Sequence, residues 1–216
     1  MAEAKQYSRR MQKAERARRY AERFETGSRK GINLREQRAV AKIFDALPDC
    51  RSIIDVPSGA GRFAKVLSRG RELIEADVAF EILEFARERA ERTKLRVSFM
   101  QSNAAKISLA DGAVDGVFCN RLLHHILKAD ERKMFLREFH RITRKYLVIS
   151  FFDYHSFGGV RRVLKALKGR KPNYDQQPTL AQFTEEVTRC GFNLREIVPT
   201  GAVWVAQKFF VLEKST

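Results

Sequence analysis

Short apolar runs alternate with longer amphipathic segments through the middle of the chain. The runs have the length and aliphatic content of strands, and they predict five strands at residues 52–56, 72–77, 97–100, 116–119 and 145–152. Helices are predicted between them, at residues 62–69, 79–93 and 130–143. Because continuous apolar strands are buried on both faces, this alternation predicts a parallel sheet that helices cover on both sides.

The C-terminal part departs from this alternation. Residues 153–178 form a basic insertion after the fifth strand, and residues 179–190 predict an amphipathic helix that Gly191 ends. Residues 192–198 and 203–212 then predict two consecutive strands, which would form a hairpin at the edge of the sheet. The expected fold class is α/β: a doubly wound, mostly parallel, seven-stranded sheet with a C-terminal antiparallel hairpin.

The N-terminal part is polar and basic, with helical periodicity. Apolar residues recur at steps of three and four between Tyr7 and Phe24, and a second helix is expected at residues 34–47, before Pro48. We expect residues 1–47 to form a basic helical cap and residues 48–216 to form one domain, since 216 residues fit one domain.

No apolar run approaches the roughly 20 residues of a transmembrane helix, and the N-terminus lacks the apolar core of a secretory signal. Cys50, Cys119 and Cys190 lie far apart and form no metal-ligand motif, so no metal site is expected. Such cysteine usage suits a reducing cytoplasm, which is the expected location.

Charge is the unusual feature of the composition. The chain has 42 Lys and Arg residues against 26 Asp and Glu residues, a net charge of +16. This balance bears on partners rather than on fold. Nucleic acid, an anionic membrane surface and an anionic small molecule are all admissible partners.

A glycine-rich turn follows the first predicted strand. Gly59 and Gly61 let the backbone approach a ligand closely, and the start of the next helix offers free N–H groups. Asp55, at the end of the strand, would repel a pyrophosphate but suits the ammonium and sulfonium groups of S-adenosylmethionine (SAM). Asp77, at the end of the second strand, can accept hydrogen bonds from both hydroxyls of a ribose.

Five segments in order resemble the motifs of class I SAM-dependent methyltransferases. They are residues 54–63, 75–77, 100–104, 109–120 and 122–126. The last resembles the ubiquinone-type subgroup, and some bacterial members carry a similar Asp-Val-Pro string. The resemblance covers residues 51–152 and implies a Rossmann-like domain with SAM as cofactor. By resemblance, SAM is held by Asp55, Pro57, Gly59, Gly61, Asp77, Val78, Asn103, Ala104 and Asn120.

Two positions depart from the family pattern. Pro57 stands where glycine is usual, and proline removes one N–H while fixing φ near −65°. Asn103 replaces the usual aspartate at the adenine, and its amide oxygen can accept the same hydrogen bond, so weakened binding is expected. An NAD-dependent enzyme and a domain without catalysis remain alternatives.

The candidate proton acceptors are His124 and His125, which follow the fourth strand, where ligands of α/β sheets bind. His125 is the better candidate by resemblance; the alternative is that one histidine packs under the sheet and the other caps a helix. Asp115 is expected to be structural. Substrate contacts are expected at Tyr20, Tyr154, His155, Arg161 and Arg162.

The sequence does not identify the methyl acceptor. An anionic small molecule or glycolipid suits the basic insertion, and RNA or a non-catalytic scaffold role is the alternative. Neither an RNA-binding module nor an Asn-Pro-Pro-Tyr motif after the fourth strand is present. We expect the clusters Arg9–Arg23 and Arg161–Lys171 to form one basic rim around the acceptor entrance, and peripheral association with an anionic membrane stays open.

Overall fold

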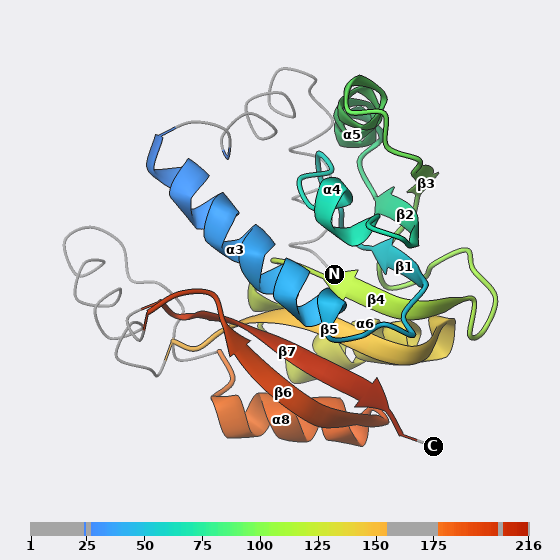
Figure 1. Ribbon diagram of the computed structural model, residues 1–216. Coiled ribbons are helices and arrows are strands. Elements are labelled where there is room, and N and C mark those ends of the chain that lie inside the picture. Colours follow the sequence, from blue (N-terminus) through green and yellow to red (C-terminus); the bar gives the residue numbers. More distant parts are fainter. Residues whose placement is uncertain (1–23, 25–26, 155–176, 203–204, 216) are drawn as a thin grey trace.

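A seven-stranded sheet forms the centre of the protein (Figure 1). The computed structural model describes residues 24, 27–154, 177–202 and 205–215. The strands are β1 (Ser52–Asp55), β2 (Glu72–Asp77), β3 (Ser98–Gln101), β4 (Val114–Cys119), β5 (Thr143–Phe152), β6 (Phe192–Pro199) and β7 (Gln207–Lys214). Their order across the sheet is β3-β2-β1-β4-β5-β7-β6.

The pairing confirms the predicted fold class. β1 pairs in parallel with β2 and β4, β2 with β3, and β4 with β5. β7 runs antiparallel to both β5 and β6, so β6 and β7 form the expected hairpin at the sheet edge. The second strand of this hairpin begins at Gln207, four residues later than the predicted start at residue 203.

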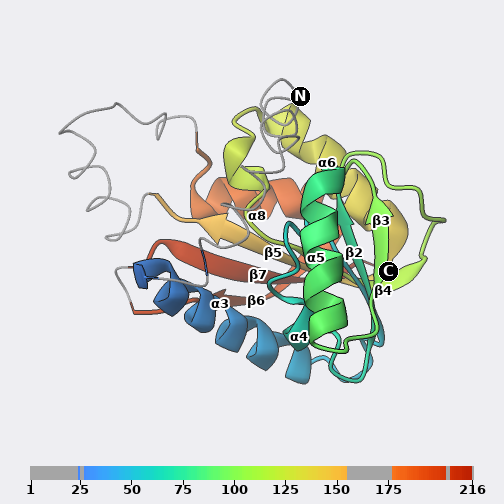
Figure 2. The ribbon, with the colours of Figure 1, turned by 90° about the horizontal axis from the view of Figure 1, so that it is seen from above.

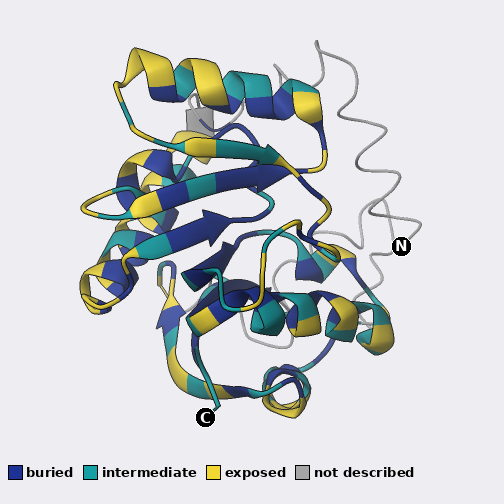
Figure 3. Ribbon diagram, turned by 90° about the vertical axis from the view of Figure 1, so that its right-hand side faces the viewer, coloured by how far each residue is buried: buried dark blue, intermediate teal, exposed yellow. Residues whose placement is uncertain are grey.

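Helices cover both faces of the sheet (Figure 2). On one face lie α3 (Gly27–Asp45) and α4 (Ala64–Leu67); on the other lie α6 (Ala129–Ile142) and α8 (Leu180–Arg189). α5 (Phe80–Arg92) packs on β2 and β3. Because side chains alternate along a strand, Phe118 packs with α3 and α4 while the preceding Val117 packs with α6 and α8. The central strands are buried along most of their length (Figure 3).

Two helices differ from their predicted ranges. α3 begins at Gly27 rather than at residue 34, and its buried face carries Val40, Ile43 and Phe44 together with the charged Glu36. α4 spans four residues, because residues 59–63 belong to the turn that follows β1. α8 matches its prediction: a capping box at Thr179 begins it, and Gly191 follows its end with a φ of 86°.

The topology places ligands at one edge of the sheet. β1 to β5 run in the same direction, so their carboxyl ends lie together, and the chain order switches between β1 and β4. In open α/β sheets, ligands bind at such a switch point, outside the carboxyl ends of the strands. None of the described helices is both long and apolar enough to cross a bilayer.

Candidate functional site

The turn after β1 is held against both neighbouring strands. Val56 donates its backbone N–H to the oxygen of Phe118 on β4 at 2.9 Å, and Ser58 donates to Ala76 on β2 at 2.8 Å. Pro57 follows a cis peptide bond. Gly59 and Gly61 have φ angles of 57° and 66°, which glycine adopts without strain. The sequence therefore folds here into a tight turn at the switch point, in which residues 58–61 are buried.

Asp77 ties this turn to the end of β2. Its carboxylate accepts hydrogen bonds from the backbone N–H groups of Gly59 and Ala79, each at 3.0 Å. Burial raises the pKa of Asp77 to about 6, and these two N–H groups oppose the rise. Each carboxylate oxygen has a further lone pair, so the group can also accept the two hydroxyls of a ribose.

Two more carboxylates lie beneath the same turn. Asp55 and Glu75 are 1% and 0% exposed, and none of their four oxygens has a hydrogen-bond partner. Burial, then the neighbouring Glu75, holds the pKa of Asp55 well above its usual range. Glu75 was not predicted as a site residue. The available signal was its position: a charged residue inside an apolar strand, two residues before Asp77 and thus on the same face.

The turn after β3 forms another part of the site. Ser102 and Ala104 are buried, whereas Val78 is 36% exposed and faces away from the core. The side-chain oxygen of Asn103 accepts a hydrogen bond from the N–H of Ala105 at 3.0 Å. That oxygen retains one lone pair, so the predicted bond from an adenine amino group to Asn103 stays possible in chemical terms and stays a prediction.

The turn after β4 is fixed by residues from the far end of the chain. Asn120 is buried and accepts from Gln207 Nε2 at 3.3 Å, while Arg121 donates Nη2 to Gln207 Oε1 at 3.1 Å. Arg121 has a φ of 60°, an uncommon conformation for a residue other than glycine. Its backbone N–H donates to Ser150 Oγ on β5 at 2.7 Å, which holds that conformation.

Glu36 joins α3 to two of these turns. It is 1% exposed and forms ion pairs with Arg62, next to Gly61, and with Arg121. The two guanidinium groups lie 4.3 and 5.4 Å from the centroid of the Phe24 ring. Sequence reasoning missed this cluster, although Glu36 lies four residues before Val40 on the apolar face of its helix.

The two predicted histidines begin a row of rings beside the turn after β4. His125 lies 3.9 Å from His124, His124 lies 4.5 Å from Phe152, and Phe152 lies 6.1 Å from Tyr154, all between ring centroids. His125 is exposed and His124 is half-buried. The predicted positions His124, His125 and Tyr154 are thus brought together, with Phe152 as the link that was not predicted. We call these four residues the aromatic row.

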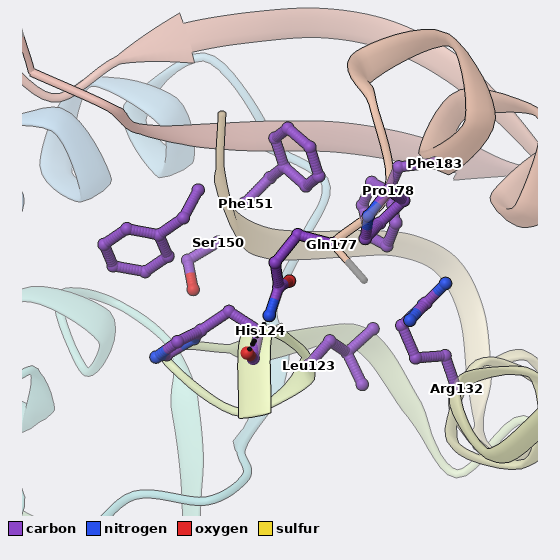
Figure 4. Close-up of a pocket in the computed structure, with 9 residues that line it drawn as sticks. Leu123, His124, Arg132, Ser150, Phe151, Gln177, Pro178 and Phe183 are labelled. Carbon is purple, nitrogen blue, oxygen red and sulfur yellow. Dashed lines mark hydrogen bonds between the residues drawn. The ribbon is translucent and has the colours of Figure 1, made fainter. Parts of the chain in front are cut away.

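A small pocket lies behind His124 (Figure 4). Gln177 donates Nε2 to the backbone oxygen of His124 at 2.8 Å. Arg132, 3% exposed, pairs with Glu186 and donates to the oxygens of Ile126 and Leu127 at 2.8 and 2.6 Å. Because Arg132 is fixed by α8 and binds the turn after β4, it holds the histidines in place.

Other predicted residues take no part in this arrangement. Asp115 lies at the start of β4, at the opposite end of the sheet, where it accepts from Arg51, Ser52 and Arg144. This agrees with its expected structural role. Tyr20, His155, Arg161, Arg162 and both basic clusters lie outside the described residues. Within the described residues, no three His, Cys, Asp or Glu side chains come together as metal ligands.

The donor set suits SAM. Gly61 leaves no room for a Cβ, which would lie 2.7 Å from Glu75 Oε2, so the glycine lets this turn pack directly on β2. Asp77 has further lone pairs for a ribose, and the Asp55 carboxylate, which has no hydrogen-bond partner among the described residues, suits a cationic group. Fold and site together define a Rossmann-like protein of the kind that binds a nucleoside cofactor at the switch point of its sheet.

Residues 54–149 match the family described as "Methyltransferase domain". This part of the chain is thus a domain of the SAM-dependent methyltransferase type. It is 35% identical over 91 residues to the demethylmenaquinone methyltransferase of Thermus thermophilus, covering 40% of each chain. It is 24% identical over 132 residues to a malonyl-[acyl-carrier protein] O-methyltransferase of Hamiltonella defensa, covering 61% of this chain and 46% of that protein. The matches thus span less than half of these two relatives.

The fold is shared over a greater length. The magnesium protoporphyrin IX methyltransferase of Synechocystis PCC 6803, solved with bound SAH, aligns with a TM-score of 0.74 and 14% identity. The alignment covers 99% of this chain and 100% of that one. The same enzyme solved with bound SAM gives a TM-score of 0.73. These likenesses confirm the Rossmann-like methyltransferase architecture.

Proposed function

We propose that this protein transfers the methyl group of SAM to an anionic small molecule that carries an apolar or aromatic body. One observation carries the proposal: the aromatic row runs past the turn after β4, and the Arg121 guanidinium lies 5.5 Å from the Phe152 ring centroid. The Nε of Arg121 is buried without a hydrogen-bond partner in the described structure. A flat apolar body can stack on the row while its anionic group approaches Arg121.

The names of similar proteins support a small acceptor. They describe a demethylated menaquinone, a malonyl group on a carrier protein and a magnesium porphyrin. Each of these acceptors is a small organic group, and none is a nucleic acid. Identity at these levels does not transfer a particular acceptor to this chain, so the proposal names the chemical class only.

Each residue has a defined task in this proposal. SAM supplies an electrophilic methyl group on its sulfonium. Asp77 holds the ribose, Asp55 faces the cationic end of the cofactor, and Val78, Asn103, Ala104 and Asn120 border it, with Pro57, Gly59 and Gly61 shaping the turn. Arg121 orients the acceptor, and His125, exposed at the end of the row, takes the proton that the reacting atom loses.

The direct test follows the methyl group. The protein is incubated with methyl-labelled SAM and with lysate separated into small-molecule, lipid, RNA and protein fractions. Label in the small-molecule fraction is expected. Label confined to RNA would replace this proposal with RNA methylation, and label in lipid would point to the glycolipid alternative. SAM binding without any transfer would support the non-catalytic scaffold role.

The charge of the acceptor is tested by Arg121→Met, which keeps the length of the side chain and removes its charge. The KM for the labelled acceptor should rise at least about tenfold, because a hydrogen bond to a charged group is lost. Arg189→Met on α8, which removes an exposed arginine paired with the exposed Glu185, is the matched control and should leave the KM unchanged. An unchanged KM for Arg121→Met would contradict the anionic acceptor.

RNA is the second candidate, and the net charge of +16 is the observation that favours it. The dependence of binding on salt concentration distinguishes RNA from a small anionic acceptor. Affinity for a single-stranded RNA should fall with salt with a log–log slope of roughly −0.7 for each phosphate contacted. A small anionic acceptor makes one or two such contacts, so its KM should depend on salt only slightly.

A further inference from the structure

Asp55 and Glu75 are direct neighbours in the sheet. They are paired positions in the parallel ladder of β1 and β2, so their side chains leave the same face side by side. Both are almost fully buried, and the four carboxylate oxygens accept no hydrogen bond from the described residues. Two ionised carboxylates in such a place would be strongly unfavourable, since a buried charge needs a donor or water to stabilise it.

The Glu75 carboxylate lies directly beneath the glycine-rich turn. A Cβ built on Gly61 would lie 2.7 Å from its Oε2 and 3.1 Å from its Oε1. Asp77, two residues further along β2 on the same face, accepts a hydrogen bond from Gly59 in that turn. The turn therefore lies over three carboxylates, of which only Asp77 has partners.

Charges from every neighbouring element act on this pair. Arg62 in the turn, itself bound to Glu36 of α3, favours ionised Asp55, while Asp77 on β2 opposes it. Arg89 on α5 favours ionised Glu75. On β4, the Asp55 charge raises the already high pKa of the Cys119 thiol.

Burial outweighs the favourable charges around Glu75. Desolvation raises its pKa to about 8, and the Arg89 charge lowers it less than burial raises it. Neither Arg62 nor Arg89 donates a hydrogen bond to these oxygens, which all lack a partner. Near neutral pH, the protein without cofactor thus holds Glu75 in its neutral form.

We propose that Asp55 and Glu75 act as one acidic pair that releases a proton to solvent when SAM binds, and that this pair selects SAM over its demethylated product. The proposal rests on the cofactor of the family and adds Glu75 as a specificity-determining residue. A cation above the turn favours the ionised pair, and ionised carboxylates in turn hold the cation. No bond within the cofactor changes in this step; one proton leaves the pair for the buffer.

The selection follows from one charge. SAM carries a sulfonium, whereas S-adenosylhomocysteine (SAH), which remains after methyl transfer, carries a neutral thioether at the same place. The ammonium and carboxylate of the amino-acid end are common to both. Only SAM therefore supplies the extra positive charge that offsets the ionisation of Glu75. When that charge is lost on methyl transfer, the pair takes up its proton again, and the affinity for SAH is lower than for SAM.

Calorimetry measures the released proton directly. SAM and SAH are titrated at pH 7 into the full chain in phosphate and in Tris, whose ionisation enthalpies differ, so the difference in heat gives the number of protons released. We expect SAM to release about one proton and SAH clearly less. Glu75→Gln, which keeps the shape and removes the titrating group, should abolish most of the release with SAM.

Glu84→Gln is the matched control. It removes a carboxylate from the solvent-facing side of α5, where it pairs with the exposed Arg87, and should leave the number of released protons unchanged. Equal proton release for SAM and SAH would overturn the proposal, and so would a wild-type proton count in Glu75→Gln. Failure of the proposed acceptor would leave these results unaffected, because no acceptor is present.

A second measurement needs no variant. The dissociation constant of SAH divided by that of SAM, measured on the unaltered protein, should rise by up to about tenfold per pH unit between about pH 6 and 8. Above about pH 8 this ratio should stay constant. A flat ratio across this range would overturn the proposal even if Glu75→Gln did not fold.

Discussion

Glu36 and Arg121 lie 85 residues apart in the chain, and their side chains form an ion pair with a distance of 2.5 Å. Glu36 is almost fully buried and comes from α3, whereas Arg121 comes from the turn after β4. Since Glu36 also pairs with Arg62 beside the glycine-rich turn, one carboxylate joins that turn to the turn after β4. α3 thus covers the sheet and also links these two turns.

Glu36→Gln should destabilise the protein strongly. Removing one partner of a buried ion pair leaves the other charge uncompensated, which costs on the order of 3–5 kcal/mol. Asp130→Asn, which breaks the exposed pair with Lys133, should leave the unfolding midpoint unchanged. Urea unfolding compares the two, and similar small effects would show that Glu36 is not an essential link.

Gly61→Ala should impair SAM binding beyond the effect of backbone strain. The new Cβ would meet Glu75 and lie 3.2 Å from the Cβ of Ala86, at a φ of 66°. Gly70→Ala is the control for strain alone, because Gly70 has a φ of 64° and no atom within 4 Å of its added Cβ. We expect at least about a tenfold loss of SAM affinity only for Gly61→Ala, since displacement of the turn would disturb the hydrogen bond from Gly59 to the Asp77 carboxylate. If the two variants bound SAM equally well, the close approach of Gly61 to Glu75 would not be needed for SAM binding.

Asp77→Ala should weaken SAM binding roughly 10- to 150-fold, because hydrogen bonds of ribose hydroxyls to a charged group contribute about 1.5–3 kcal/mol. Asp115→Ala provides the comparison: it removes a carboxylate with several hydrogen bonds at the other end of the sheet. That variant should lower the melting temperature and leave SAM affinity near the wild-type value. A wild-type affinity for Asp77→Ala would mean that the ribose lies elsewhere.

The protein without cofactor should become less stable as pH rises. The pKa of Glu75 is about 8 in the folded protein against an ordinary value of 4.5, so the folded state holds one more proton than the unfolded state between these values. Stability then falls by up to about 1.4 kcal/mol per pH unit in this window for each such group. Asp55 and Asp77 act in the same direction, since burial raises the pKa of both.

Glu75→Gln should make this fall shallower between about pH 6 and 8, because Asp77, with a pKa of about 6, titrates mainly below that range and only Asp55, of these three carboxylates, is left to contribute there. Thermal unfolding at several pH values measures the effect, with Glu84→Gln as a control that keeps the wild-type slope. If both variants keep that slope, Glu75 is not neutral in the protein without cofactor.

His125→Ala should lower turnover by roughly 10²–10⁴-fold if His125 takes the acceptor proton, while SAM affinity stays unchanged. His124→Ala should act differently: it removes the ring between His125 and Phe152, so a change in melting temperature should accompany any loss of rate. A turnover of His125→Ala equal to wild type would exclude a proton-transfer role for this residue.

The sheet could be predicted because its strands are continuous apolar runs, and β2 begins and ends at the predicted residues. The start of β7 could not, because Gln207 pairs with Phe152, which lies far earlier in the sequence. α3 was predicted too short, since residues 27–33 are polar and lack apolar periodicity.

Local sequence patterns also identified one part of the candidate site. Asp55, Gly59, Gly61 and Asp77 lie in segments whose role depends on their immediate neighbours in the chain, and the structure brings these residues to one turn. The contacts of Arg121 with Glu36 and Gln207 join positions more than 80 residues apart, and no periodicity reports them.

β7 is synthesised after the other six strands, yet it lies between β5 and β6. Until it arrives, the ten residues of β5 have a neighbour on one side only, and β6 has no strand to pair with. Gln207, the first residue of β7, supplies the side chain that binds Asn120 and Arg121. While the chain emerges from a ribosome, the cofactor half of the sheet can therefore assemble early, whereas the acceptor side waits for the final strand.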